Sequence, residues 1–137
     1  MIEYIVNNEY GCLIYQSDDI KQSHKNNLSL IKKMCLEAFF SYDGYLKAVQ
    51  NKFGKTYRIP VYINEEHMFI PMKRTRDYDN IWLNYAAIIE VNDYDNQIEL
   101  VFGSKRKLYI NISLKSLARQ IKYLEAIRNA KVKHFHS

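Results

Sequence analysis

The chain has 137 residues, 47% of them hydrophobic and 26% charged, which suits one domain with a buried core and excludes wholesale disorder. Its two cysteines, Cys12 and Cys35, are too few and too far apart for a disulfide framework or a zinc site, so we expect buried thiols. The formal net charge is +5, and neither a signal peptide nor a run of about 20 apolar residues is recognisable, so we expect a cytoplasmic protein.

The first forty residues predict a β-hairpin followed by a segment of ambiguous period. Residues 2–6 and 13–16 are rich in Ile, Leu, Val and Tyr, and the turn residues Asn7, Asn8 and Gly11 lie between them. The polar stretch 17–27 is expected to be a loop. Apolar positions in 28–40 fit neither the helical nor the strand period, so both alternatives stay open there.

The middle of the chain predicts one short helix and a series of strands. Ser41 or Asp43 is expected to cap a helix over 44–53, which Gly54 ends in a left-handed conformation. Residues 58–64 and 67–72 are expected to form strands around the turn 64–66. Pro60 and Pro71 should mark strand edges.

The second half predicts a long strand, a hairpin and a helix. The apolar run 82–91 is expected to be a single central strand, and 92–96 a turn. Strands 97–102 and 106–112 should be joined by a tight turn in which Gly103 takes a positive φ. From Ser113 a helix is indicated by an apolar stripe at three- and four-residue steps, consisting of Leu114, Leu117, Ala118, Ile121, Leu124 and Ile127.

These elements predict an α+β fold. It would contain an antiparallel sheet of about six to seven short strands, one short helix and an amphipathic C-terminal helix. We expect one domain over 1–131 and a flexible tail over 132–137.

The basic residues are unevenly distributed along the chain. Residues 1–100 contain 11 Lys and Arg against 14 Asp and Glu, whereas the rest of the chain contains nine Lys and Arg and a single acid, Glu125. Such clustering is typical of a surface that binds a polyanion, because each neutralised phosphate releases condensed counterions. A solvated helix and tail in a basic protein would give the same count.

Four groups of cations are candidates for DNA contact. They lie at the turn 103–107, in the loop before the long strand, around the short helix, and on the polar side of the last helix. The candidate DNA-binding residues are Lys105, Arg106, Lys107, Arg74, Arg76, Lys73, Lys47, Lys52, Lys55, Lys115, Arg119 and Lys122.

The sequence offers little support for an enzyme. Acids that could gather around a metal are Asp77, Asp79, Glu90 and Glu99, but the acid-x-Lys spacing of metal-dependent nucleases is absent at the two glutamates. A phosphate-binding glycine loop and a nucleophile elbow are also absent. We therefore expect no catalytic residues, no metal and no cofactor.

An ordered set of short motifs resembles the ComK family of bacterial competence transcription factors. It spans about 2–127 and consists of Phe39-Phe40, Ser41-Tyr42-x-Gly44, Pro60 with Val61 to Ile63, Met68 to Pro71, Thr75-Arg76, Trp82, Ile98-x-Leu100-x-Phe102, Gly103 to Lys105, Ile112-Ser113, Ser116 and Gln120. Where family members often carry a basic residue after the glycine, this chain has Tyr45 and offers Lys47 instead.

The resemblance implies an activator that recognises A/T-rich promoter boxes of double-stranded DNA through the minor groove. It also implies a homo-oligomer on DNA and control by an adaptor that delivers the protein to a Clp protease. A narrow A-tract minor groove concentrates negative potential and attracts Arg and Lys, which suits the basic clusters. Two alternatives remain open: a protein-interaction or RNA-binding module, and a metal-dependent nuclease.

Overall fold

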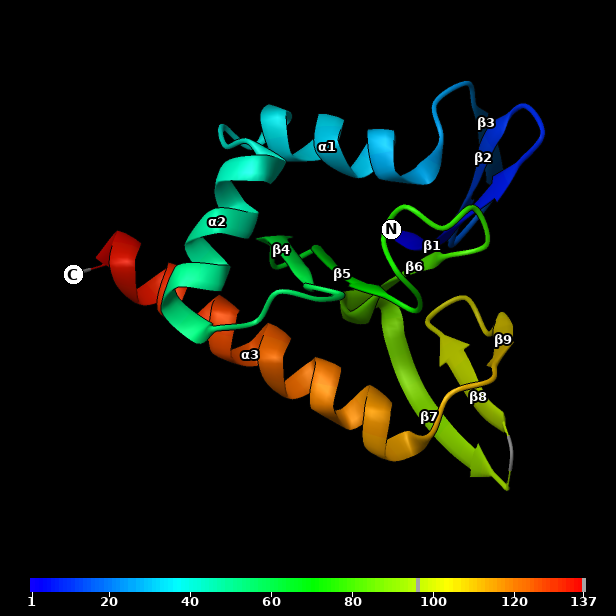
Figure 1. Ribbon diagram of the computed structural model, residues 1–137. Helices are drawn as coiled ribbons and strands as arrows, with labels where there is room; N and C mark the ends of the chain where they lie inside the picture. The colour runs from blue at the N-terminus through cyan, green and yellow to red at the C-terminus, as the bar shows by residue number, and fades with distance from the viewer. Residues whose placement is uncertain (96, 137) are drawn as a thin grey trace.

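The computed structural model describes residues 1–95 and 97–136, of which 134–136 are described by their backbone alone (Figure 1). The predicted α+β class is confirmed, with helices on antiparallel sheets. The elements in chain order are β1 (Ile2–Asn8), β2 (Gly11–Gln16), β3 (Ile20–Ser23), α1 (Asn27–Glu37), α2 (Tyr42–Phe53), β4 (Val61–Asn64), β5 (His67–Pro71), β6 (Ile81–Asn84), the 3-10 turn η1 (Tyr85–Ala87), β7 (Ile88–Tyr94), β8 (Gln97–Phe102), β9 (Lys107–Ile110) and α3 (Leu114–His136).

The strands form two sheets instead of the single sheet predicted. The larger has the order β3-β2-β1-β6-β5-β4 and the smaller the order β7-β8-β9. The first hairpin is confirmed, with Tyr4 opposite Tyr15. The polar segment after it is not simply a loop, because β3 pairs with β2 and places Gln22 opposite Leu13. The Gln22 side chain donates a hydrogen bond of 3.1 Å to the Cys12 carbonyl, which shows how a polar strand is accommodated at a sheet edge.

The undecided segment 28–40 is helical as far as Glu37, where α1 ends, and residues 38–40 form a turn. Asn26 caps it by accepting a hydrogen bond of 2.8 Å from the Ser29 amide. Asn27, Ile31 and Cys35 are buried at four-residue intervals, which is the periodicity of one helical face. Both cysteines are free and buried, as predicted, and burial raises the pKa of the Cys35 thiol to about 11.

The short helix α2 is confirmed together with its two caps. Ser41 Oγ accepts a hydrogen bond of 3.0 Å from the Gly44 amide, and Gly54 ends the helix with a φ of 71°. Tyr45 is buried, and its hydroxyl donates to the Pro60 carbonyl at 2.6 Å. This tyrosine therefore belongs to the core.

The predicted single strand over 82–91 is wrong, because the chain turns at Asn84 and passes from one sheet to the other. The buried Asn84 side chain donates to the Ile2 carbonyl at 2.7 Å and to the Glu66 carbonyl at 2.8 Å. It also accepts a hydrogen bond from the Met68 amide at 3.0 Å. These bonds end β6 without a proline or glycine, so a largely apolar run, in which Asn84 is the only polar side chain capable of ending a strand before Glu90, concealed the turn.

The turn between β8 and β9 also differs from its prediction. Lys105, with a φ of 77°, adopts the left-handed conformation that was expected of Gly103. Its amide donates to the Phe102 carbonyl at 2.9 Å, and the Gly103 amide bonds the Ala87 carbonyl at 3.1 Å.

The last helix packs on the larger sheet, as predicted. In Figure 1, α3 runs from the smaller sheet past β5 and β4 to the neighbourhood of α2. Leu117, Leu124 and Ile127 are buried, but Leu114 is 44% exposed. The helix continues through His136, past the predicted domain boundary at 131; a flexible tail over 132–137 stays a prediction, and Ser137 lies outside the described residues. Among the described residues, no helix has the length and apolar character needed to cross a membrane.

A salt bridge fastens α3 to the turn between β4 and β5. Arg128 Nε donates to Glu65 Oε2 at 2.8 Å, and the Tyr62 hydroxyl donates to the same oxygen at 2.5 Å. The hydrogen bonds from Arg128, and next from Tyr62, lower the pKa of the Glu65 carboxyl from 4.5 to about 2. Its side chain is 56% exposed, so solvent screens much of the attraction.

The sign of this pKa shift predicts a loss of stability in acid. Glu65 contributes stability that is complete above pH 4.5 and is lost as the pH falls towards about 2, because protonation breaks the bridge. We expect Glu65→Gln to lower the free energy of unfolding by about 0.5 kcal/mol at pH 7 and to remove that part of the acid dependence. Urea denaturation between pH 7 and pH 2 measures both. Glu66→Gln, at the neighbouring exposed carboxylate, is the control, and equal acid dependence in the two variants would contradict the bridge.

Candidate nucleic-acid interface

The cations of the β8–β9 turn point in different directions. Lys105 is exposed, and Lys107 is exposed with its Nζ 3.8 Å from Glu99. Arg106 points inward, where its Nη1 donates to Glu3 Oε1 at 2.7 Å and to the Gln16 carbonyl at 2.8 Å. Glu3 is fully buried, so the Arg106 guanidinium neutralises a carboxylate within the protein.

The cations of the β5–β6 loop are partly neutralised as well. Lys73 pairs with Asp79, and Arg74 Nε lies 3.3 Å from Asp77. Arg76 is exposed and has no carboxylate within salt-bridge distance in the part of the chain that the structure describes.

These two groups of cations lie at opposite ends of strand β1. The β8–β9 turn contacts Glu3, near the start of β1, through the Ser104 amide and Arg106. The β5–β6 loop contacts its end, where the Asn7 side chain donates to the Tyr78 carbonyl at 2.9 Å. Four residues of extended chain span about 13 Å, so the two groups form separate patches.

A third group converges where the end of α2 meets α3. The Lys55 ammonium lies 4.3 Å from the ring centre of Tyr123 on α3. Burial, and then the neighbouring charges of Arg58 and Arg119, lower the pKa of Lys55, which places the three cations close together. Figure 1 shows the segment after α2 passing beside α3.

Two further lysines extend this group along α3. Lys115 precedes Arg119 by four residues and Lys122 follows it by three, so all three project from one side of the helix, and all are exposed. In residues 1–95 and 97–133, whose side chains the structure describes, no carboxylate lies within salt-bridge distance of any of these five cations. We call Lys55, Arg58, Lys115, Arg119 and Lys122 the α2–α3 basic cluster.

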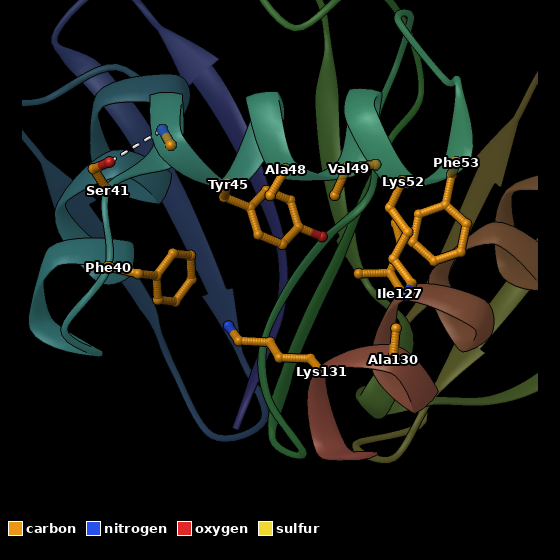
Figure 2. A pocket seen from close by; sticks show the side chains of 11 residues that line it. Phe40, Ser41, Tyr45, Ala48, Val49, Lys52, Phe53, Ile127, Ala130 and Lys131 are labelled. Carbon is orange, nitrogen blue, oxygen red and sulfur yellow. Dashed lines mark hydrogen bonds between the residues drawn. The ribbon is translucent and has the colours of Figure 1, made fainter. Parts of the chain in front are cut away.

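The remaining candidates on α2 lie outside this cluster. Lys47 is exposed on the outer side of the helix, two residues from the buried Tyr45. Lys52 lines a groove between α2 and α3, beside Phe53 and Ile127 (Figure 2).

Sequence reasoning missed Arg58 because it assigned the residue to a strand. The strand begins at Val61 instead, and Arg58 sits in the preceding loop, where its carbonyl accepts a hydrogen bond of 2.8 Å from the Gln120 side chain. Its guanidinium carbon lies 5.3 Å from the ring centre of Tyr57, which is 54% exposed. The alternation of cations and aromatic residues over 55–58 was the available signal.

Three of the four acids considered for a metal site are engaged in other contacts, and the fourth, Glu90, is exposed. Asp77 and Asp79 pair with cations of their own loop. Glu99 accepts hydrogen bonds from the Tyr109 hydroxyl at 2.7 Å and from the Asn92 amide at 2.9 Å. Within the described residues, no three His, Cys, Asp or Glu side chains gather as a metal site requires.

Similarity to known proteins places the chain in a family. The family model described as ComK protein matches residues 1–133. This chain belongs to the ComK family. ComK proteins are competence transcription factors, so the chain is a DNA-binding regulator of a non-enzymatic family. No curated protein and no solved structure matches the chain.

The motifs that carry the family likeness are largely structural. Phe69, Trp82 and Phe102 are fully buried, and Gln120 holds the loop at Arg58. The family motifs therefore identify residues that pack the fold, and they do not identify the residues that contact DNA.

The position of Arg106 predicts that its removal destabilises the protein. We expect Arg106→Ala to lower the free energy of unfolding by about 3 kcal/mol, because Glu3 would keep a buried charge without its cation. Urea denaturation at pH 7 measures this loss. Lys105→Ala, at the exposed neighbour, should change stability by less than about 0.5 kcal/mol.

A double variant separates the charge from the packing. The double variant Glu3→Gln/Arg106→Met should be more stable than the single variant Arg106→Met, since the double variant buries no unpaired charge. Equal stability of Arg106→Ala and Lys105→Ala would show that the Glu3–Arg106 pair does not support the fold.

Proposed function

We propose that this ComK-family protein activates transcription by binding A/T-rich promoter boxes through the minor groove, with the α2–α3 basic cluster on the DNA backbone. The observation that carries the proposal is a group of five cations without carboxylate partners among the described residues: Lys55 and Arg58 lie beside α3, and three more project from one side of that helix. Crowding of like charges raises the free energy of the unbound surface, and phosphates relieve it.

The geometry of α3 suits the backbone of a duplex. Lys115, Arg119 and Lys122 are spaced over about two turns of the helix, which is about 10 Å along its axis. Charges spaced over this length can contact successive phosphates and fix the protein on the duplex without reading its sequence. The half-buried Lys55 and Arg58 add charge beside this row.

We assign minor-groove contact to the β8–β9 turn. Lys105 and Lys107 project from a narrow turn, and the adjoining Gly103 is exposed, with open space on the side where a Cβ would stand. The narrow minor groove of A-tracts attracts inserted cations. Arg106 contributes by holding the turn to Glu3.

The other predicted residues have secondary parts in this proposal. Arg76 lies near the start of α2 beside Tyr42 and would contact a flanking phosphate. Lys73 and Arg74 would exchange their aspartates for phosphates on binding. Lys47 and Lys52 would add long-range attraction.

We propose that two or more copies bind neighbouring boxes on one promoter. Because the basic patches of one copy are separated, each copy would contact the DNA at more than one point. Family membership supports this homo-oligomer and also supports control by a Clp-protease adaptor. A promoter-binding regulator of this kind would act in the cytoplasm, where bacterial DNA is located.

Binding should be strongly salt-dependent and should favour A/T-rich duplex. Neutralisation of five phosphates by the α2–α3 basic cluster alone gives an expected slope of about −4.5 in log affinity against log salt concentration, or roughly a 500-fold loss between 50 and 200 mM, and the other proposed contacts would make the slope steeper. Fluorescence anisotropy with A/T-rich and G/C-rich duplexes of equal length measures both. Equal affinity for the two duplexes would refute A/T readout, and tighter binding to RNA of equal length would favour the RNA-binding alternative.

Substitution within the cluster should weaken binding to every duplex by a similar factor. We expect Arg119→Ala to lower DNA affinity about tenfold and to reduce the salt slope by about 1, because a phosphate contact is lost. Lys21→Ala, at an exposed lysine on the edge strand β3, is the matched control and should bind as the unaltered protein does. Indistinguishable binding by the two variants would remove the α2–α3 basic cluster from the interface.

A further inference from the structure

An apolar groove lies between α2 and the C-terminal half of α3. Its volume is about 540 Å³, and its walls come from both helices and from the two residues that precede α2 (Figure 2). The lining residues are Phe40, Ser41, Gly44, Tyr45, Ala48, Val49, Lys52, Phe53, Ile127, Ala130 and Lys131. Aliphatic and aromatic side chains with a few polar groups are typical of small-molecule sites, which commonly measure about 300–1,000 Å³.

One wall of the groove carries a partly desolvated ammonium group. Lys131 Nζ lies 3.7 Å from the ring centre of Phe40 and donates a hydrogen bond of 3.2 Å to the Tyr62 carbonyl. Two more ring centres, those of Tyr45 and Tyr62, lie 5.8 and 5.6 Å away. Figure 2 shows the Lys131 side chain extending across the groove towards Phe40.

This ammonium has no carboxylate partner in the part of the chain that the structure describes. Within the described residues no carboxylate lies within 4.0 Å of Lys131 Nζ, and burial lowers the pKa of its side chain. A cation that has lost part of its hydration gains free energy from a counter-ion in the same low-dielectric site. The groove therefore combines apolar walls with an uncompensated positive charge.

Other polar groups of the groove add to this character. Lys52 extends from α2 towards the same space (Figure 2). Ser41 Oγ accepts a hydrogen bond from the Gly44 amide, so its O–H can still donate to a ligand. The Tyr45 hydroxyl is already engaged, donating to the Pro60 carbonyl and accepting from the Tyr62 amide. Every remaining polar group favours a negatively charged head.

We propose that this groove binds a single-chain anionic amphiphile, with its alkyl chain between Val49, Phe53 and Ile127 and its carboxylate at Lys131. The complementarity is of two kinds, because the alkyl chain covers apolar walls and the head neutralises the desolvated ammonium. A protein helix fits less well. With side chains it is about 10 Å across and rises 5.4 Å per turn, so a volume of this size holds only about one turn.

Titration of the purified full-length chain with decanoate tests the proposal. Isothermal titration calorimetry, below the concentration at which decanoate forms micelles, should give saturable 1:1 binding. Chemical-shift changes should centre on the methyl groups of Val49 and Ile127, a readout that needs no variant. Decan-1-ol, which has the same chain without the charge, should bind more weakly.

Three variants separate charge from shape. Lys131→Met should weaken decanoate binding about tenfold or more and leave decan-1-ol binding unchanged, because only the charged contact is lost. Ala48→Trp, at an exposed position of α2 on the groove, should weaken both ligands. Lys133→Met, the same change at an exposed lysine on the same helix, is the control and should bind both normally. Far-ultraviolet circular dichroism and thermal unfolding verify that each variant is folded.

Several results would overturn the proposal. Absence of saturable decanoate binding by the unaltered chain would do so. Equal decanoate affinity of Lys131→Met and Lys133→Met would remove the ammonium from the site. Binding of an acidic amphipathic peptide to the same methyl groups, without decanoate binding, would assign the groove to a protein partner.

Discussion

The pair formed by Glu3 and Arg106 joins the two sheets of the protein. Glu3 belongs to β1 in the larger sheet and is fully buried, whereas Arg106 precedes β9 in the smaller one. The cost of burying the carboxylate is offset only while the guanidinium stays within hydrogen-bond distance. The Ser104 amide, 3.3 Å from the same carboxylate, fixes the turn further. The salt bridge between Arg106 and the buried Glu3 therefore positions the two exposed lysines, Lys105 and Lys107, on either side of Arg106.

The basic residues of the C-terminal part thus divide into two kinds. Arg106 and Arg128 bind carboxylates of the protein, and Lys131 lies against aromatic rings. Lys115, Arg119 and Lys122 remain exposed without such partners in the described part of the chain. Net charge alone cannot distinguish the two kinds, because a cation used for folding and one offered to DNA contribute equally to the sum. The acidic partners Glu3 and Glu65 are distant in sequence, which is why the charge count suggested a larger surface than the structure provides.

Local signals in the sequence were sufficient for the two ends of α2 and insufficient for long-range contacts. The capping residue Ser41 and the left-handed Gly54 predicted α2 correctly, since both act on neighbouring backbone groups. Asn84 ends β6 through carbonyls of Ile2 and Glu66, which no local pattern reveals. Arg106 pairs with a residue 103 positions away, so its inward direction was equally hidden. Lys131, by contrast, lies four residues after Ile127, a spacing that puts both on one face of the helix, but its inward position was not predicted.

Backbone strain occurs at two of the basic positions and has a different meaning at each. Arg58 and Lys105 both adopt a positive φ, of 47° and 77°, which costs an ordinary residue about 1 kcal/mol where glycine would cost nothing. The surrounding hydrogen bonds hold both conformations, from Gln120 to the Arg58 carbonyl and from the Lys105 amide to Phe102. The Arg58 guanidinium also supports the fold, because its Nη1 donates a hydrogen bond of 3.3 Å to the Met72 carbonyl, whereas the Lys105 side chain is exposed. The strain at Arg58 is therefore offset within the protein, and only the strain at Lys105 supports the minor-groove contact proposed for the β8–β9 turn.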